Sequence, residues 1–274
     1  MSRQQESIAR TLLVAFVVCL VCSVIVASAA VLLRPTQVEN RQLDRQRYIL
    51  EIAGLARPDA STRDIQRIFH DRIKARVVDL DSGRYTDRQQ ADTFDPLQAA
   101  KDPAQSMALT GADDIASIHR REYQSIVYQV EDEHGGLQTL ILPVRGYGLW
   151  STLYGFIALK SDLNTVVGLG FYQQAETAGL GGEVDNPRWR ALWPGKQVFD
   201  GNGQPDITII KGTVDPSNPR AAHQVDGLAG ASLTSKGVGN LLKFWLGPKG
   251  FGPFIAHLRN ASPHSSRQAS AGGR

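Results

Sequence analysis

The most regular pattern along the chain is an unbroken apolar run near its amino terminus. No charged side chain occurs between Thr11 and Leu33. At about 1.5 Å per residue, a helix over this stretch is long enough to cross a bilayer core of about 30 Å. The pattern predicts a transmembrane helix over residues 11–33, preceded by a short amino-terminal segment, residues 1–10.

A cleaved secretory signal is the competing interpretation of this run. Ala27-Ser28-Ala29 offers an A-x-A cleavage pattern, but the run continues to Leu33 and is longer than a usual signal, which favours an uncleaved anchor. The flanking arginines, Arg3 and Arg10 before the run against Arg34, Arg41, Arg45 and Arg47 after it, would keep the large domain cytoplasmic. Long domains can cross the membrane largely regardless of charge, so the pattern leaves the side open.

Periodicity after the run predicts a mixed domain. Arg34-Pro35 marks a break, and helices are expected over residues 37–53 and 62–76, the second with a Ser61/Thr62 cap. Residues 80–117 are interpreted as connecting structure. Alternating positions predict one hairpin from strands 125–131 and 137–144, a second from strands 155–160 and 165–172, and a further strand over 207–211.

The last predicted helix has the clearest amphipathic period. Its apolar positions follow i, i+3, i+4, i+7 and i+8, and Gly247-Pro248 ends it: Val238, Leu241, Leu242, Trp245 and Leu246. Residues 261–274 have no such period and are expected to form a flexible tail. The expected fold is α+β, with one amino-terminal membrane helix, a helical and connecting part over 34–120, and a largely antiparallel sheet with flanking helices over 121–260.

Composition narrows the functions that this fold could serve. The 274 residues carry a formal net charge of +3 without a basic run, which argues against nucleic-acid binding. The two cysteines, Cys19 and Cys22, lie inside the apolar run, which excludes a multi-disulfide scaffold or a four-cysteine metal site. The histidines are scattered singly, which argues against a metal site.

Two glycine-rich segments, residues 176–183 and 226–235, are the candidates for chemistry. Backbone N–H groups of such loops and the amino terminus of a helix beginning near Ser232 could bind a phosphate group. The alternative is that the glycines serve tight turns and that Ser232 or Thr234 is an N-cap. Dinucleotide-binding and Walker motifs are missing, and a serine hydrolase using Ser232, His223 and Asp226 is poorly supported because these residues are too close in sequence for the usual triad.

Four segments carry motifs that occur together in a known family. They are Gly148 to Phe156, Glu176 to Pro187, Asp226 to Val238, and Phe244 to Phe254. In this order, and with a single amino-terminal membrane helix, they resemble the C subunit of the Na⁺-translocating NADH:quinone oxidoreductase. The resemblance implies that residues 121–260 form an FMN-binding domain whose FMN is joined through its phosphate to a hydroxyl side chain.

The acceptor of FMN is implied by the family pattern Ser-Gly-Ala-Thr, in which the threonine carries the flavin. This chain has Ala229 in place of the serine and Ser232 at the acceptor position. Serine retains a hydroxyl that can attack the pyrophosphate of FAD in a separate flavin transferase. Ser232 is therefore the predicted acceptor, and Thr234 is the second candidate.

The remaining site residues also follow from the resemblance. Glu176, Thr177, Gly179, Leu180 and Gly181 would wall the isoalloxazine ring. Lys211 would balance the phosphodiester charge or be a solvated surface lysine, and Trp150 would stack near the flavin or pack in the core. Asp226, Leu228, Gly230 and Ala231 would belong to the loop and to the motif that the transferase recognises.

The resemblance implies an electron-transfer subunit that has no complete activity alone. It would relay electrons from NADH toward ubiquinone, coupled to Na⁺ export, beside the other subunits of the complex in a bacterial inner membrane. Residues 34–274 would be periplasmic, against the arginine count. The alternatives are the homologous G subunit of the ferredoxin-coupled complex, a membrane-tethered serine hydrolase, and a flavin-less scaffold.

Overall fold

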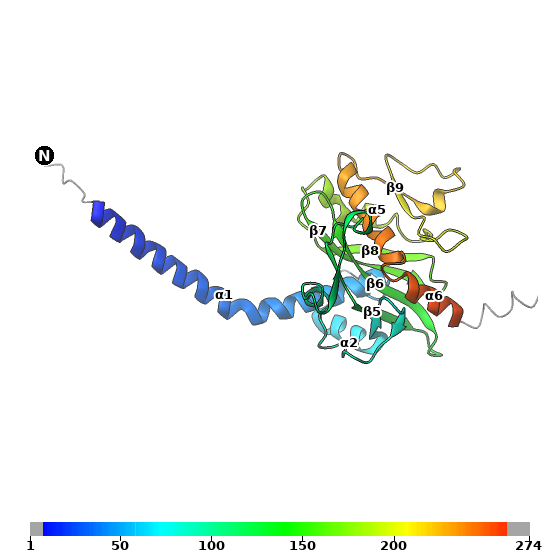
Figure 1. Cartoon of the computed structure of the whole chain (residues 1–274), viewed down its shortest axis with the longest axis horizontal. Coiled ribbons are helices and arrows are strands. Elements are labelled where there is room, and N and C mark those ends of the chain that lie inside the picture. Colours follow the sequence, from blue (N-terminus) through cyan, green and yellow to red (C-terminus); the bar gives the residue numbers. More distant parts are fainter. Residues whose placement is uncertain (1–7, 58, 262–274) are drawn as a thin grey trace, which may run out of the picture. The chain divides into compact units, whose positions relative to one another are not determined.

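The computed structural model of the chain describes residues 8–57 and 59–261 (Figure 1). It divides into two compact units, one ending at Arg45 and one beginning at Gln46. The first unit is formed by most of helix α1 (Ile8–Ile52), and the second contains the last turns of α1 and all other elements. The predicted tail beyond residue 261 lies outside the described residues.

Helix α1 contains the predicted membrane segment and continues beyond it. It is long and apolar enough to cross a membrane, with a mean hydropathy of 2.9 over its most apolar window. The break predicted at Pro35 is wrong, because Pro35 lies inside the helix. A proline there removes one backbone hydrogen bond, to the carbonyl of Val31, and the turns on both sides continue the helix.

A six-stranded antiparallel sheet forms the centre of the second unit, and it confirms the predicted fold class. The strands in spatial order are β2 (Arg84–Tyr85), β1 (Ile73–Asp79), β5 (Gln124–Glu131), β6 (Leu137–Tyr147), β7 (Thr152–Lys160) and β8 (Val166–Gln173). Both predicted hairpins are present, as the pairs β5–β6 and β7–β8. A four-residue turn, residues 148–151, joins β6 to β7, which also pair with each other.

Helix α2 (Thr62–Arg72) is shorter than predicted. The Ser61 hydroxyl accepts a hydrogen bond from the backbone N–H of Asp64 and caps the helix as expected. Residues 73–76 are not helical, because β1 begins at Ile73 and pairs along its whole length with β5. Pairing with a distant strand thus outweighs the local helical period.

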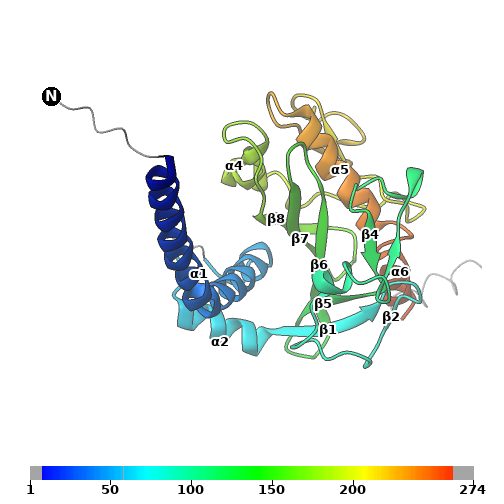
Figure 2. The same cartoon turned by 60° about the vertical axis from the view of Figure 1, so that its left-hand side comes forward.

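Both faces of the sheet are buried. On one face, the Tyr128 ring packs edge-on against Phe69 of α2 and Phe156 of β7, and the last turn of α1 adds the buried Ile49 and Leu50. Figure 2 shows these helical segments on one side of the strands and α5 (Ser232–Leu246) on the other. The sheet is therefore the middle layer of the domain.

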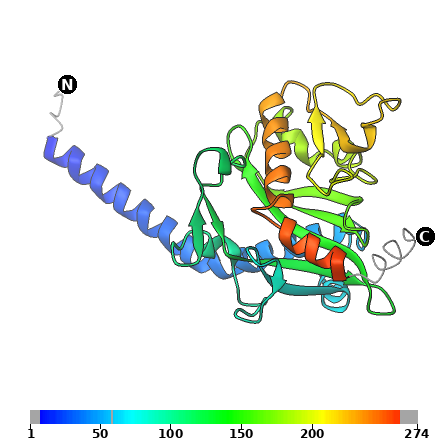
Figure 3. The same cartoon turned by 45° about the vertical axis from the view of Figure 1, so that its right-hand side comes forward.

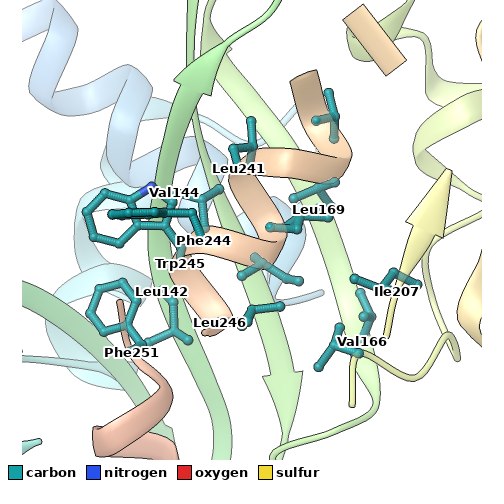
Figure 4. Packing of buried hydrophobic residues seen from close by; sticks show 14 of the residues in the cluster. Leu142, Val144, Val166, Leu169, Ile207, Leu241, Phe244, Trp245, Leu246 and Phe251 are labelled. Atoms are coloured by element: carbon teal, nitrogen blue, oxygen red, sulfur yellow. The ribbon is translucent and has the colours of Figure 1, made fainter. Parts of the chain in front are cut away.

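The other face carries the main hydrophobic core. Helix α5 packs against β6, and Leu142 and Val144 of β6 lie near Trp245 and Phe251 in Figure 4. A further helix, α6 (Gly252–Ala261), follows α5 along this face (Figure 3) and was not predicted. Helix α5 ends before Gly247-Pro248, as predicted. After a short loop the chain forms α6, in which Phe254 and Ile255 are buried.

Shorter elements complete the domain. The predicted strand 207–211 is present as β9 (Thr208–Ile210), which pairs in parallel with β10 (Gln224–Asp226) outside the main sheet, next to α5 in Figure 3. The others are α3 (Pro96–Ala99), the antiparallel pair β3 (Ser106–Ala108) and β4 (Arg120–Glu122), α4 (Pro187–Arg190), and the 3-10 helices η1 (Gly111–Asp113), η2 (Gly181–Asp185) and η3 (Ala221–His223).

Candidate functional site

The two glycine-rich segments meet at the amino terminus of α5. The Thr234 hydroxyl in the first turn of α5 donates a 2.8 Å hydrogen bond to the carboxylate of Glu176. Gly230 has a φ of +71°, a conformation that favours glycine, and a Cβ built there would lie 2.9 Å from a methyl group of Leu180. The fold thus brings together residues that are far apart in the sequence.

We call the place where the two glycine-rich segments meet the corner. Glu176 connects the corner to the turn between β6 and β7. Its carboxylate accepts hydrogen bonds from the backbone N–H groups of Leu149, Trp150 and Ser151 at 3.0–3.2 Å, and from the Ser151 hydroxyl at 3.0 Å. Burial raises the pKa of Glu176, but the hydrogen bonds from Thr234 and from the turn outweigh it and hold the pKa below its ordinary value. Glu176 is therefore an ionised acceptor that connects its own loop after β8 to the turn between β6 and β7 and to the first turn of α5.

A groove lies on the other side of the first turn of α5, between this helix, β9 and the loop that follows β10. Its volume is about 630 Å³. Five of the predicted site residues line it: Lys211, Asp226, Leu228, Gly230 and Ser232. Asp226 also holds the groove in shape, since its carboxylate accepts a 2.8 Å hydrogen bond from the backbone N–H of Val214.

Hydroxyl groups at the start of α5 differ sharply in their exposure. Ser232, the first residue of α5, is exposed and lies on the wall of the groove. Thr234 is fully buried and donates to Glu176, while the Ser235 hydroxyl is buried and accepts from the backbone N–H of Leu228 at 3.0 Å. Only Ser232 among these three hydroxyls is open to a reacting molecule.

Apolar side chains surround the same corner on its solvent side. Trp150 is 67% exposed and belongs to the turn between β6 and β7, so it does not pack in the core. Leu149, Leu180 and Leu233 are also exposed. We call these four residues the apolar rim, and they can contact a planar ring held near Ser232.

The other predicted site residues shape the loop between β8 and η2 with their backbone. The Thr177 carbonyl accepts hydrogen bonds from the N–H groups of Leu180 and Gly182 at 3.1 and 2.9 Å, and Gly179 has a φ of +75°. Gly181 is buried at the start of η2, and Ala231 is buried at the N-cap position of α5. Thr177, Gly179, Gly181 and Ala231 do not line the groove.

Two lysines of the groove were missed by the sequence analysis. Lys236 and Lys243 lie on α5 and line the groove together with Lys211. The helix is predicted to begin near Ser232, so both lysines fall within it. On this helix both lysines lie on the same face as the serine, at i+4 and i+11, and this spacing was the available signal.

The geometry does not favour a serine hydrolase. The ring nitrogen Nδ1 of His223 lies 3.0 Å from the Gln197 carbonyl oxygen, and His223 does not line the groove beside Ser232. The carboxylate of Asp226 is engaged by Val214. Within residues 8–57 and 59–261, no group of three or more His, Cys, Asp or Glu side chains is placed to hold a metal ion.

Comparison with known proteins defines the class and then the family. Residues 148–247 match the FMN-binding domain family. The chain is 65% identical over 255 residues to the C subunit of the Na(+)-translocating NADH-quinone reductase of Pseudomonas aeruginosa, covering 93% of this chain and 97% of that protein. It is 48% identical to the corresponding C subunit of Yersinia pestis, covering 95% and 96%.

Solved structures agree with this assignment. The crystal structure of NqrC from Shewanella oneidensis superposes with a TM-score of 0.74 at 34% identity and covers 82% of this chain and all of that chain. The C subunit from Parabacteroides distasonis gives a TM-score of 0.60 at 28% identity, covering 81% and 96%. An FMN-binding domain therefore follows the apolar helix. The chain belongs to the NqrC family, the C subunits of the Na⁺-translocating NADH-quinone reductase, an oxidoreductase complex.

Proposed function

We propose that this chain carries FMN as a phosphoester on Ser232 and serves as an electron-transfer subunit of the Na⁺-translocating NADH-quinone reductase. The observation that carries the proposal is the exposed Ser232 hydroxyl on the wall of a lysine-lined groove. Bound FMN would supply reversible electron transfer, which the side chains of this protein cannot perform.

The burial of the neighbouring hydroxyls supports Ser232 over Thr234 as the acceptor. Using Thr234 would require breaking its hydrogen bond to Glu176 and unwinding the first turn of α5. That change would leave the buried Glu176 carboxylate without one of its donors, which is costly for a buried charge. Ser232 needs no such rearrangement because its side chain is already exposed.

Attachment would require a flavin transferase and FAD as the donor. The Ser232 oxygen would attack the phosphorus of the FMN half of FAD, forming a new P–O bond. The anhydride P–O bond to AMP would break, AMP would leave with the bonding electron pair, and the serine proton would pass to a base of the transferase. No electron is gained or lost in this step.

The residues around Ser232 suit the two ends of FMN. Lys211 would face the phosphodiester from across the groove, while Asp226, Gly230 and Ala231 shape the loop leading to Ser232. The apolar rim, with Trp150 and Leu180, would contact the ring. Glu176, Thr177, Gly179 and Gly181 would hold the rim in place through the loop between β8 and η2 and the turn bonded to Glu176.

Helix α1 supports a place in the bacterial inner membrane. We propose that residues 11–33 span it, with residues 34–274 in the periplasm, beside the other subunits of the complex. In that place the domain would relay electrons on their path from NADH toward ubiquinone, coupled to Na⁺ export. A covalent bond would keep the flavin on an exposed site that must meet more than one partner.

The test is covalent flavin analysis after co-expression with a flavin transferase. The chain should give a fluorescent band on a denaturing gel, and peptide mass spectrometry should place FMN on Ser232. Ser232→Ala should abolish the band, while Ser232→Thr, which keeps the hydroxyl, should retain it. Persistent fluorescence on Thr234 in Ser232→Ala would overturn the acceptor assignment, and no covalent flavin with an active transferase would overturn covalent attachment.

A further inference from the structure

We propose that Lys236 is a second positioning cation for the phosphate group at Ser232, acting with Lys211 from the opposite side of the groove. This inference rests on the proposed function and extends it to a residue that the sequence analysis did not identify. The ligand class is a phosphate ester or a free phosphate ion. Lys236 touches no reacting ring atom in this proposal and acts only on the phosphate oxygens.

The spacing on α5 places Lys236 beside Ser232. Residues four apart on a helix are neighbours, with Cβ atoms about 5–6 Å apart. Both residues line the same groove and both are exposed. A lysine ammonium at that position can reach an anion bonded to the serine oxygen without any change in the backbone.

Lys211 completes the pair from another element. It directly follows β9, so the backbone that carries it belongs to the opposite wall of the groove from α5. Two ammonium groups from different walls can contact different oxygens of one phosphate, and hydrogen bonds of this charged kind are stronger than neutral ones. The phosphate would then be fixed in orientation as well as in position.

The charges of the groove also favour an anion. Among the described residues, neither Lys211 nor Lys236 nor Lys243 forms an ion pair. Asp226 is the one acidic residue on the lining, and its Oδ1 atom already accepts from Val214. Beside Ser232, Lys211 and Lys236 against one engaged carboxylate leave an excess of positive charge that a phosphate diester would reduce.

Lys243 provides a matched control inside the same groove. It is exposed like Lys236 and lies on the same helix face, but it follows Ser232 by eleven residues, or about 16 Å along the helix axis. A lysine side chain at that distance cannot contact a phosphate bonded to Ser232. Removing its charge should therefore leave the phosphate undisturbed.

The first experiment measures the accessibility of each lysine in the full-length chain in detergent. The chain loaded by the transferase, and confirmed by mass spectrometry to carry FMN on Ser232, is compared with the unloaded chain by acylation with a dilute amine-reactive ester. Lys236 and Lys211 should react at least about threefold more slowly after loading, while the rate at Lys243 stays constant. An unchanged rate at Lys236 in the loaded chain would overturn the proposal.

A second measurement separates this inference from the acceptor assignment. The unloaded chain is treated with the same reagent in the presence and absence of millimolar inorganic phosphate, with chloride matched for ionic strength. Protection of Lys236 and Lys211 but not Lys243 would support the site even if Ser232 proved not to carry FMN. No protection in this comparison and none after loading would remove the site altogether.

Variants test whether the charge itself is needed. With limiting transferase, Lys236→Gln should lower the initial rate of FMN attachment by about tenfold, Lys236→Arg should restore it to within about twofold, and Lys243→Gln should leave it unchanged. Equal unfolding midpoints of the variants show that the fold is intact. Equal attachment rates for Lys236→Gln and Lys243→Gln would contradict the proposed role.

Discussion

Glu176 shows how one buried carboxylate can organise a functional corner. It accepts hydrogen bonds from the turn between β6 and β7 and from the first turn of α5, so two segments that flank the groove and the apolar rim depend on its negative charge. Its lowered pKa means that the folded domain favours the ionised form. The carboxylate therefore stabilises the fold above the ordinary pKa of glutamate, and this contribution is lost as the pH falls.

Glu176→Gln should reduce the stability of the domain at neutral pH by about 2–3 kcal/mol, because an amide replaces a charged acceptor and turns an N–H₂ group toward backbone donors. Denaturant unfolding at several pH values provides the measurement. The difference between wild type and variant should be largest near pH 7 and shrink as the pH falls below about 4.3, the ordinary value for glutamate. A difference that does not depend on pH would contradict the role of the charge.

The pKa of Asp185, further along the chain, is shifted in the opposite direction to that of Glu176. Burial raises its pKa, and the hydrogen bond from Gln174 together with the positive charge of Arg190 offsets this only in part. One of its carboxylate oxygens, Oδ1, is buried without a hydrogen-bond partner within the described part of the chain. The ionised form of Asp185 therefore opposes folding at neutral pH.

Asp185→Asn should stabilise the domain at pH 7–8 by about 0.5–1 kcal/mol, since a neutral amide removes the buried charge and can still accept from Gln174. The sign follows from the raised pKa: the wild type loses stability as the pH rises through the range between the ordinary and the raised value. Thermal unfolding at pH 3.5 and pH 8 measures the effect. Destabilisation at pH 8 but not at pH 3.5 would show instead that Arg190 needs the charge of Asp185.

At the scale of elements, the close approach of α5 to the end of β6 positions Ser232. A Cβ at Gly237 would collide with the Tyr147 carbonyl oxygen and lie 2.9 Å from the Gly148 Cα atom, both of which are backbone atoms. Trp245, at the other end of α5, is fully buried and donates a 2.7 Å hydrogen bond to the Arg145 carbonyl. The helix is thus held against β6 and the turn after it from Gly237 to Trp245.

Gly237→Ala should destabilise the domain by about 1–3 kcal/mol, because the added methyl group forces α5 away from the backbone of β6. Gly239→Ala is the matched control on the same helix, where a Cβ meets nothing within 4 Å. Alanine there should gain about 0.5–1 kcal/mol from its higher helix propensity. Chemical denaturation of both variants tests this, and similar effects at the two positions would show that the contact with β6 is not tight.

At the scale of the whole molecule, the division after Arg45 separates the long apolar part of α1 from the sheet-containing unit. The last residues of α1 belong to the second unit. Ile49, Leu50 and Ile52 are buried there, and Glu51 lies 3.5 Å from Arg190 in an ion pair. The boundary of the folded domain therefore lies inside α1 and not at its end.

A chain without residues 1–45 should be soluble without detergent, keep the unfolding midpoint of the full-length domain, and accept FMN at Ser232. Removal of residues 1–52 should cost at least about 4 kcal/mol, because three buried aliphatic side chains are lost at about 1.5–3 kcal/mol each. Comparing the two truncations by denaturant unfolding isolates the contribution of residues 46–52. Equal stabilities would mean that the last turn of α1 is dispensable.

The sequence alone determined the features that depend on local periodicity or on contiguous motifs. The apolar run predicted the membrane-length helix, period-two alternation predicted both hairpins, and the motifs between Gly148 and Phe254 indicated the family. These predictions succeed because the residues that face the core or the membrane recur at a fixed interval along a helix or strand, or follow one another without a break. Burial therefore leaves a pattern that can be seen in the sequence itself.

Tertiary structure alone decided which side chains at the corner are buried, exposed or brought together. Glu176 and Thr234 are 58 residues apart, and the fold joins them by a hydrogen bond at the buried face of α5 while Ser232 is exposed. The start of α5 near Ser232 is predicted by the sequence, whereas the groove that Lys236 lines depends on partners from other segments. Contacts between distant segments leave no periodic trace in the sequence, so the groove and its charges became visible only once the chain was folded.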